Sequence, residues 1–165
     1  MEGFLTFQAM TEITDLSEQS AAALRTLNNA FAKETSFLDE ADWARLTEMA
    51  RFAFTTPDAF IIAFDQGAAY DSPNFLWFRD RFERFVYIDR VVVAASAHGQ
   101  GLGRKLYEKL FEDAKAAGYP CVLAEVNTNP PNPGSIGFHA KMGFDAVEDV
   151  TWSPEKSVRY FARTL

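Results

Sequence analysis

The sequence predicts a single α/β domain spanning residues 1–165. The strongest indication lies in residues 87–117, where a strand rich in β-branched residues is followed by a glycine-rich turn and an amphipathic helix. A further strand is expected at residues 122–126, and this strand–helix–strand order implies a parallel pair with a right-handed crossover. The chain has 165 residues, 48% of them hydrophobic, and no Ser/Gly/Pro-rich linker divides it, so one core of ordinary size is expected.

Two amphipathic helices are predicted in the first third of the chain. Apolar residues recur at steps of three and four from Leu16 to about Lys33 and again from Leu38 to Phe52. The residues that carry the pattern are Leu24, Leu27 and Phe31 in the first segment and Trp43, Leu46 and Ala50 in the second. The sequence Thr56-Pro57-Asp58 is expected to end the second helix, and residues 60–64 read as a buried strand.

An aromatic segment follows at residues 72–85, where phenylalanines recur at three- and four-residue steps with charged residues between them. We expect a short helix there, with Ser72 or Asn74 near its first residue. Two interpretations stay open for this aromatic stripe. Either it packs on the sheet, or Trp77 or a neighbouring ring walls a substrate pocket.

The second half of the chain alternates strands and helices. Residues 87–94 form the predicted central strand, and the helix that begins near Leu102 is expected to end at Gly118. The elements expected after the strand at 122–126 are a proline-rich loop (127–134), a short helix (135–142) and two closing strands (144–150 and 158–163).

Composition narrows the class of protein. The formal net charge of -7 argues against non-specific nucleic-acid binding and mildly favours cationic partners such as amines. The lone Cys121 excludes an internal disulfide framework and fits a reducing compartment. No signal peptide or membrane-spanning run is visible, so a soluble, cytoplasmic protein is expected. His98 and His139 are far apart in sequence and lack a cysteine partner pattern, so no metal site is expected.

The glycine-rich turn is the first functional signal. Gly99, Gly101 and Gly103 allow a ligand to approach the main chain closely and allow positive φ angles. The turn points bare backbone amides and the positive end of the following helix at one place, an arrangement suited to a phosphate. Neither common nucleotide motif fits. The third glycine of G-x-G-x-x-G would fall on Arg104 or Leu106, and the second glycine of a Walker A loop would fall on Arg104.

Together with the preceding strand, this turn resembles the acetyl-CoA-binding core of the GCN5-related N-acetyltransferase (GNAT) superfamily. The family pattern is a V-x-V-type strand followed by Q/R-x-x-G-x-G/A and a helix. The matching residues here are Val91-Val92-Val93 and His98-Gly99-Gln100-Gly101-Leu102-Gly103. His98 departs from the usual Gln or Arg. The departure is modest, because most pyrophosphate contacts in that family come from backbone amides.

A second motif resembles the ribosomal-protein alanine acetyltransferase branch of the same superfamily. In that branch a strand ending in Glu-Val is followed by Asn, by Tyr seven residues further on, and then by Gly-Phe. This chain has Glu125-Val126, Asn132, His139 in place of the Tyr, and Gly143-Phe144 at those spacings. The two motifs together cover residues 87–144.

The resemblance implies a GNAT-type fold, with a mixed, mostly antiparallel central sheet, a splayed parallel pair and helices on both faces. It also implies that acetyl-CoA is the cosubstrate and that its acetyl group moves to a primary amine by direct attack. Main-chain groups of Val91 and Val93 would bond the pantetheine arm, and the Val93 N–H would stabilise the tetrahedral oxyanion. The residues expected to hold acetyl-CoA are Val91, Val92, Val93, His98, Gly99, Gln100, Gly101, Leu102, Gly103, Arg104 and Asn132.

Three polar residues near the motifs have structural alternatives. Asn132 either bonds the cofactor arm or caps the helix that begins near Ser135. Arg104 and Lys105 either reach cofactor phosphates or are ordinary exposed residues of a helix.

The implied chemistry requires a base, because an alkylammonium with a pKa of ~10.4 is almost wholly protonated at neutral pH. Glu125, near the carboxyl end of its strand, is the expected base, acting directly or through water, as the corresponding Glu does in the alanine acetyltransferase branch. Its alternative role is an ion pair with a nearby Arg. Asp89 is a second candidate base, although its neighbour Arg90 equally indicates a structural ion pair.

His139 is expected to give a proton to the departing thiolate, which is the role of Tyr in many GNAT members. An imidazole with a pKa of ~6.5 donates a proton near pH 7 more readily than a phenol with a pKa of ~10. His139 could instead exchange roles with Glu125 and act as the base. It could also only orient the thioester by a hydrogen bond, or cap the packing at the short helix.

The sequence leaves the acceptor open among a peptide N-terminus, an amino acid, a polyamine, an antibiotic and other small amines. The alternative function is a non-catalytic acyl-CoA-binding or regulatory module, in which His98 and His139 reflect loss of catalysis. A homodimer is plausible for this fold, and neither nucleic acid nor a membrane is expected as a partner.

Overall fold

The computed structural model describes residues 12–165, which contain seven strands in one sheet and six α-helices. The strands are β1 (Thr14–Asp15), β2 (Phe52–Thr56), β3 (Ala59–Asp65), β4 (Val86–Val93), β5 (Cys121–Asn129), β6 (Asp145–Ser153) and β7 (Lys156–Thr164). The helices are α2 (Ala21–Ala30), α3 (Ala32–Thr35), α4 (Glu40–Met49), α5 (Pro73–Arg79), α6 (Leu102–Ala116) and α7 (Pro133–Lys141).

The strands follow the order β1-β2-β3-β4-β5-β7-β6 across the sheet. β4 and β5 are parallel, with Val86 opposite Val122 and Tyr87 opposite Leu123. The β1–β2, β2–β3, β5–β7 and β6–β7 pairs are antiparallel. The predicted mixed, mostly antiparallel sheet with one parallel pair is therefore confirmed.

The chain forms two compact units. The first unit contains the described residues up to Phe64 together with Asp89–Leu110, and the second contains Asp65–Ile88 and Phe111–Leu165. Both β4 and α6 contribute residues to each unit. The glycine-rich turn therefore belongs to the first unit, whereas Glu125 and His139 belong to the second.

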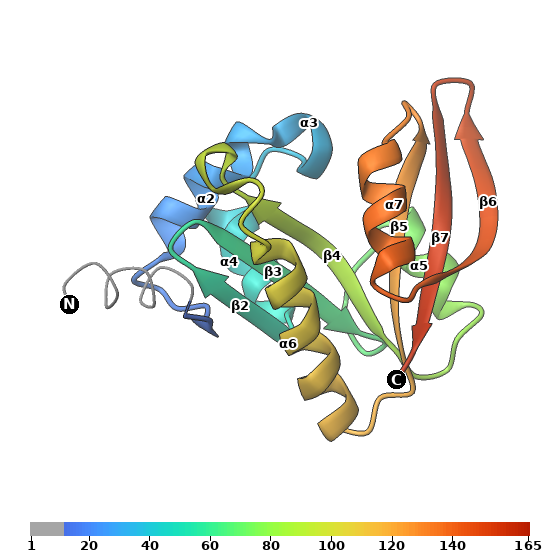
Figure 1. The fold of residues 1–165 in the computed structure, drawn as a ribbon, viewed down its shortest axis with the longest axis horizontal. Helices are drawn as coiled ribbons and strands as arrows, with labels where there is room; N and C mark the ends of the chain where they lie inside the picture. Colours follow the sequence, from blue (N-terminus) through green and yellow to red (C-terminus); the bar gives the residue numbers. More distant parts are fainter. Residues whose placement is uncertain (1–11) are drawn as a thin grey trace. The chain divides into compact units, whose positions relative to one another are not determined.

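In the first unit, helices cover both faces of the β2–β3 hairpin (Figure 1). The ring of Phe60 meets Trp43 of α4 edge-on, with 5.4 Å between ring centroids. Phe54 lies opposite Ile61, the neighbour of Phe60, and therefore faces the other side of the hairpin. On that side the ammonium of Lys109 on α6 lies 5.4 Å from the Phe54 ring centroid. α4 and α6 thus pack on opposite faces.

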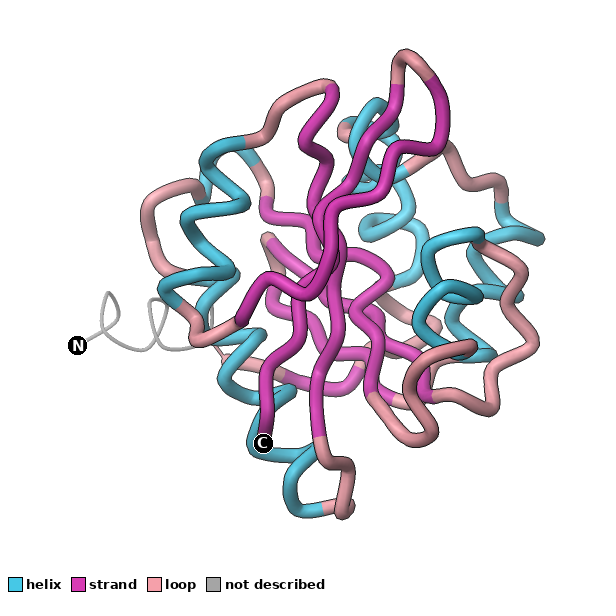
Figure 2. The backbone as a smooth tube through the Cα atoms, turned by 90° about the vertical axis from the view of Figure 1, so that its right-hand side faces the viewer, coloured by secondary structure: helices cyan, strands magenta, loops and turns pink. Residues whose placement is uncertain are grey.

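In the second unit, α5 and α7 cover opposite faces of the β5–β7 pair. Trp77 of α5 stacks on Tyr160 at 4.1 Å between ring centroids, and His139 of α7 stacks on Phe161 at 5.6 Å. Tyr160 and Phe161 are adjacent in β7, so their side chains point to opposite faces. Glu125 lies opposite Tyr160 in the register and therefore faces α5. Figure 2 shows β7 side by side with β6, the largely exposed strand at this edge of the sheet.

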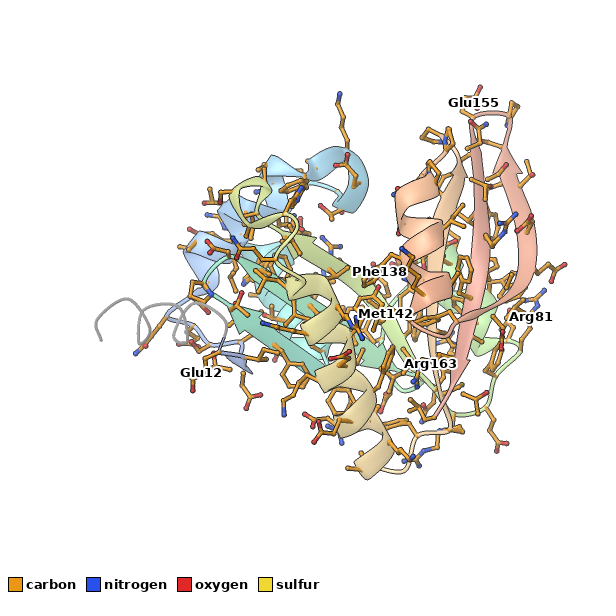
Figure 3. The ribbon with its side chains drawn as sticks, viewed as in Figure 1. Glu12, Arg81, Phe138, Met142, Glu155 and Arg163 are labelled. Atoms are coloured by element: carbon orange, nitrogen blue, oxygen red, sulfur yellow. The ribbon has the colours of Figure 1, made fainter. Side chains whose placement is uncertain are left out.

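Arg163 of β7 fixes the C-terminal end of α7. Its Nε donates to the carbonyl oxygen of Met142 at 3.0 Å, and its guanidinium carbon lies 4.1 Å from the Phe111 ring centroid. Figure 3 labels Arg163 and Met142 at this contact. The end of the helix that carries His139 is therefore tied to the strand beneath it.

The sequence prediction is wrong around the β2–β3 hairpin. α4 ends at Met49 instead of Phe52, because Ala50 has an extended ψ of 131°. Residues 52–56 form β2, a strand that was not predicted, and the buried Phe52 and Phe54 alternate with Ala53 at the period of two typical of a strand. The segment 56–58 is therefore the hairpin turn, with Thr56 paired to Ala59, and does not end a helix.

The other predicted elements are present with shifted ends. The first helix begins at Ala21 instead of Leu16, and α5 ends at Arg79, before the last two phenylalanines of its stripe. The strands predicted at 60–64, 87–94, 122–126, 144–150 and 158–163 are β3, β4, β5, β6 and β7, and the helices predicted at 102–117 and 135–142 are α6 and α7. None of the helices within residues 12–165 is both long enough and apolar enough to span a bilayer.

Candidate active site

The glycine-rich turn joins β4 to α6 in the first unit. After β4 the chain makes a short 3₁₀ turn, η1 (Ala95–Ala97), and then reaches α6. Gly99 and Gly101 have φ angles of 84° and 73°, which residues with side chains rarely adopt. A Cβ at either position would meet no atom within 4 Å, so the space beside this main chain is open. The positive φ angles that the sequence allows are therefore found at Gly99 and Gly101, whereas Gly103 lies in the helix α6.

Gly101→Ala is expected to lower the free energy of unfolding by about 1–2 kcal/mol, because alanine is forced into the left-handed region. Gly137 is the matched control, since it lies inside α7 and a Cβ there also meets nothing within 4 Å. Gly137→Ala should raise the free energy of unfolding by about 0.5–1 kcal/mol. Urea denaturation of both variants measures the difference. Equal effects of the two substitutions on the free energy of unfolding would show that the positive φ angle of Gly101 does not determine the cost of adding a side chain there.

The side chains around the turn make local contacts. His98 is exposed, and its Nε2 donates to the carbonyl oxygen of Val93 at 3.0 Å, since a carbonyl only accepts. Arg104 Nε donates to Glu108 Oε1 one turn along α6 at 2.8 Å. Of the other matched residues, Val92 and Leu102 are buried, Val91, Val93 and Gly103 are half-buried, and Gln100 and Lys105 are exposed.

Asp89 forms the ion pair that its sequence neighbour indicates. Asp89 Oδ2 lies 2.7 Å from Arg90 Nε, and the two side chains are 4% and 6% exposed. Arg90 Nη1 also donates to Asn28 Oδ1 at 2.9 Å, and Asn28 is fully buried in α2. This buried, hydrogen-bonded pairing within the first unit favours the structural interpretation of Asp89 over the role of a base.

Glu125 of β5 receives two hydrogen bonds on one carboxylate oxygen. Tyr87 OH donates to Oε1 at 2.8 Å, and Asn74 Nδ2 donates to the same oxygen at 3.2 Å. Tyr87 comes from β4 and Asn74 from the first turn of α5, so three elements meet at this oxygen. Donors directed at a carboxylate oxygen favour its charged form.

Tyr87, Asn74 and Tyr160 are residues of this cluster that the sequence motifs do not contain. Tyr160 OH donates to Asn74 Oδ1 at 2.7 Å, which joins β7 to the cluster. One signal for Asn74 exists in the sequence, because it is the single polar residue within 73–78. Tyr87 places a hydroxyl in a strand of mostly aliphatic residues, two positions before Asp89.

The aromatic stripe of α5 packs on the sheet, which confirms the first of its two interpretations. Phe75 and Phe78 are fully buried, and their ring centroids lie 5.5 and 5.7 Å from that of Tyr87. Trp77 is 7% exposed, and the guanidinium carbon of Arg81, labelled in Figure 3, lies 4.0 Å from its ring centroid. These rings hold in place the tyrosines that reach the Glu125 cluster.

His139 lies among aromatic rings on the face of the β5–β7 pair opposite Glu125. It stacks on Phe161 and meets Phe144 edge-on at 5.1 Å between centroids. Its Nδ1 lies 2.7 Å from the carbonyl oxygen of Ser135, so Nδ1 carries the proton. Burial lowers the pKa of His139, and the hydrogen bond to Ser135 opposes this only in part. The imidazole is therefore neutral at pH 7, and Nε2 has no proton to donate.

The residues of the second motif thus lie at two separate places in the second unit. Glu125 and His139 face opposite sides of the β5–β7 pair. Asn132 Oδ1 accepts from the Ser135 N–H at 3.2 Å, which is the helix cap, one of the two alternatives for this residue. Burial raises the pKa of the Cys121 thiol, which makes it a poor nucleophile. Within the part of the chain that the structure describes, no three His, Cys, Asp or Glu side chains gather as metal ligands.

The neutral state of His139 predicts that stability falls in mild acid. Its pKa is lowered in the folded protein, so below pH ~6.5 the unfolded chain binds a proton more readily than the folded one. The stability that His139 contributes is therefore complete above that pH and is lost as the pH falls toward the folded pKa. His139→Phe should show a smaller loss of stability between pH ~7.5 and ~5.5 in urea denaturation than the wild type. An equal loss in both proteins would contradict this assignment.

Comparison with known proteins identifies the family. Residues 22–144 match the model of the Acetyltransferase (GNAT) family. This chain belongs to the GNAT family. The matched range includes the glycine-rich turn, Glu125 and His139, and it contains both motifs, which span residues 87–144.

One curated N-acetyltransferase is similar over a short stretch. The chain is 38% identical over 64 residues to glucosamine 6-phosphate N-acetyltransferase 1 of Oryza sativa subsp. japonica. This stretch covers 39% of the chain and 36% of that relative. The chain therefore spans about a third of the length of the curated relative it matches.

Solved structures show the same fold over nearly the whole chain. The ribosomal-protein-S18-alanine N-acetyltransferase from Escherichia coli has a TM-score of 0.66 at 18% identity and covers 93% of this chain and 92% of its own. An acetyltransferase from Salmonella typhimurium, solved with its cofactor acetyl-CoA, also has a TM-score of 0.66 at 18% identity, with 93% of both chains covered. The predicted GNAT fold is therefore confirmed.

Proposed function

We propose that this GNAT protein is an acyl-CoA-dependent N-acetyltransferase that moves an acetyl group from acetyl-CoA to a primary amine by direct attack. The observation that carries the proposal is the Glu125 carboxylate, whose Oε1 accepts hydrogen bonds from Tyr87 and Asn74. Both bonds favour the anion, which is the state that a general base needs. Glu125 also occupies the position of the Glu in the second motif.

The proposed task of Glu125 is to remove a proton from the amine. An alkylammonium with a pKa of ~10.4 has no lone pair available for attack on a thioester until that proton leaves. A carboxylate within hydrogen-bonding reach, directly or through one water, can accept the proton. The neutral nitrogen then forms the new C–N bond.

The glycine-rich turn supplies groups that fit the diphosphate of acetyl-CoA. At Gly99 and Gly101 the main chain carries no side chain, and the open space beside it lets phosphate oxygens reach the backbone N–H groups. We assign the diphosphate to residues 98–103 at the start of α6, where the helix dipole also favours an anion. Main-chain groups of Val91 and Val93 are assigned to the pantetheine arm. Bound acetyl-CoA supplies the acetyl group as a thioester.

His139 and Asn132 are assigned supporting roles. Because Nδ1 of His139 donates to Ser135 and burial lowers the pKa of the ring, proton donation from His139 would need an imidazolium that its surroundings disfavour. Neither ring nitrogen has a proton left for a thioester, which only accepts hydrogen bonds, so we assign His139 the role of capping the packing at the short helix α7. Asn132 caps α7 through Oδ1, so its Nδ2 group is the one proposed to bond the cofactor arm.

An acceptor-amine screen tests the proposed function. Purified protein is incubated with acetyl-CoA and single amines, and the release of free thiol is followed. The panel includes a peptide with N-terminal alanine and glucosamine 6-phosphate, the acceptor classes named for two similar proteins. Amine-dependent thiol release supports the transferase. Binding of acetyl-CoA without thiol release for any amine favours the alternative, a non-catalytic acyl-CoA-binding module.

A further inference from the structure

A chain of hydrogen bonds runs from β6 to the Glu125 carboxylate. Trp152 Nε1 donates to Tyr160 OH at 3.2 Å, and Tyr160 OH donates to Asn74 Oδ1 at 2.7 Å. Asn74 Nδ2 then donates to Glu125 Oε1 at 3.2 Å, where Tyr87 OH also donates at 2.8 Å. The five side chains come from β6, β7, α5, β5 and β4, and all of them belong to the second unit.

The direction of these bonds is fixed by the donor at the outer end. The indole Nε1–H of Trp152 can only donate, so the Tyr160 oxygen accepts there and its single proton is left for Asn74. The amide oxygen of Asn74 therefore faces Tyr160, which turns the amide NH2 group toward Glu125. The reversed amide would place two acceptors, the Asn74 oxygen and the carboxylate, against each other.

We propose that Tyr87, Asn74 and Tyr160 are positioning residues that hold Glu125 as an ionised hydrogen-bond acceptor, and that Tyr160 acts on Glu125 only through Asn74. The inference rests on the proposed function, in which Glu125 takes the proton from the amine. Hydrogen bonds to a charged acceptor are stronger than those between neutral groups, so two donors at one oxygen hold both the charge and the orientation of the carboxylate.

Tyr160 is well suited to a fixed donor role. Burial is the largest cause that raises the pKa of Tyr160 to about 12, opposed by the hydrogen bond from Trp152 and by the charge of Arg81, and assisted by the charge of Glu125. Its hydroxyl therefore keeps its proton throughout the neutral range. The phenol donates to Asn74 in all conditions under which acetyl transfer would be assayed.

The titratable and charged groups near Glu125 come from three neighbouring elements. Among the described residues they include Tyr87 on β4 and Tyr160 on β7; Arg81, just after α5, acts by its charge on Tyr160, and His139 lies on the opposite face. Replacing either tyrosine with phenylalanine removes a neutral hydroxyl and changes no charge at neutral pH. A shifted titration of Glu125 in such a variant therefore reports a lost hydrogen bond.

The test is an NMR titration of the Glu125 carboxyl carbon in protein labelled with 13C-glutamate, and the spectrum of Glu125→Gln identifies the signal. The measurement needs no acceptor amine. Tyr87→Phe should raise the titration midpoint by about one pH unit, which corresponds to about tenfold in proton affinity. Tyr160→Phe should raise it by less, because the Asn74 amide is then free to turn. Both variants keep the buried rings that pack against α5.

Tyr119→Phe is the matched control. Tyr119 OH donates to Asp65 Oδ2 at 2.7 Å, so the same tyrosine–carboxylate contact is removed outside the network. This variant should leave the Glu125 midpoint unchanged. If Tyr87→Phe and Tyr160→Phe also titrate like the wild type, the positioning role is refuted.

A double variant tests the route through Asn74. Tyr160→Phe added to Asn74→Ala should move the midpoint no further than Asn74→Ala alone. A full additional shift in that background would mean that Tyr160 acts on Glu125 directly, and the proposed route would be wrong.

Activity measurements keep this inference separate from the proposed function. Once an acceptor is known, the acidic limb of kcat/KM should move to higher pH in Tyr87→Phe and Tyr160→Phe and stay in place in Tyr119→Phe. Full activity of Glu125→Gln would overturn the role of Glu125 as base, while the NMR titration would still decide whether the network holds the carboxylate. If Glu125→Gln loses activity but the acidic limb of kcat/KM stays in place in both Tyr87→Phe and Tyr160→Phe, the positioning role of the network is refuted and the role of Glu125 as base is kept.

Discussion

Replacing Glu125 with Gln should lower kcat for acetyl transfer by about 10²–10⁴-fold, the usual contribution of a general base. The Gln side chain keeps an oxygen that can accept from Tyr87 and Asn74, so the geometry of the cluster is preserved. What it loses is the ability to hold the proton that leaves the amine. Initial rates at saturating acetyl-CoA measure the effect.

The affinity for CoA provides the internal control of this experiment. The groups assigned to CoA lie in the glycine-rich turn, in β4 and at Asn132, so calorimetric titration should give nearly the same dissociation constant for wild type and Glu125→Gln. Glu148→Gln, at an exposed position of β6, should retain wild-type kcat. If Glu125→Gln also retained wild-type kcat, the base would have to be another residue.

Asp89→Ala should lower the free energy of unfolding by about 3–5 kcal/mol, the usual cost of removing one partner of a buried ion pair. Arg90 is 6% exposed, and its guanidinium would keep the Asn28 hydrogen bond but lose the carboxylate 2.7 Å away. An uncompensated charge would then remain in the interior of the first unit. Urea denaturation at neutral pH measures the loss.

Asp149→Ala is the matched comparison, since Asp149 pairs with Arg159 at 2.7 Å and is 59% exposed. Removal of that surface pair should cost about 1 kcal/mol or less. Asp89→Ala should also keep a normal kcat in its folded fraction at low temperature. A variant that is as stable as the wild type and has lost its turnover would instead identify Asp89 as the base.

The parts of the fold that could be predicted are those in which a local sequence pattern is compatible with only one type of secondary structure. The strand, glycine-rich turn and helix at 87–117 follow from residue types that act over a few positions, and Gly99 and Gly101 do adopt the expected φ angles. β2 was missed because apolar residues continue with little interruption from α4 into the strand, and Phe52 comes only two residues after Ala50. The pairing of Phe52 with Ala63 shows that the helix has ended and that a strand has begun.

Within the candidate site, the sequence predicted the motif residues but not the side chains that form hydrogen bonds with them. Glu125 follows from motif spacing, but its donor Asn74 lies 51 positions earlier in the chain. Periodicity indicates the face on which a residue lies, yet the hydrogen-bond partner depends on how α5 packs on the sheet. The same limit applies to His139, whose low pKa arises from burial among rings contributed by α7 and by the strands after it.

The strand order at one edge of the sheet has a consequence for synthesis of the protein. β7 follows both β5 and β6 in sequence, yet it lies between them. On the ribosome, β5 and β6 emerge before their shared partner, so neither strand can form its pairing with β7 until the last strand has been synthesised. Because β7 also carries Tyr160, the hydrogen-bond network that reaches Glu125 can be completed only after this last strand has paired.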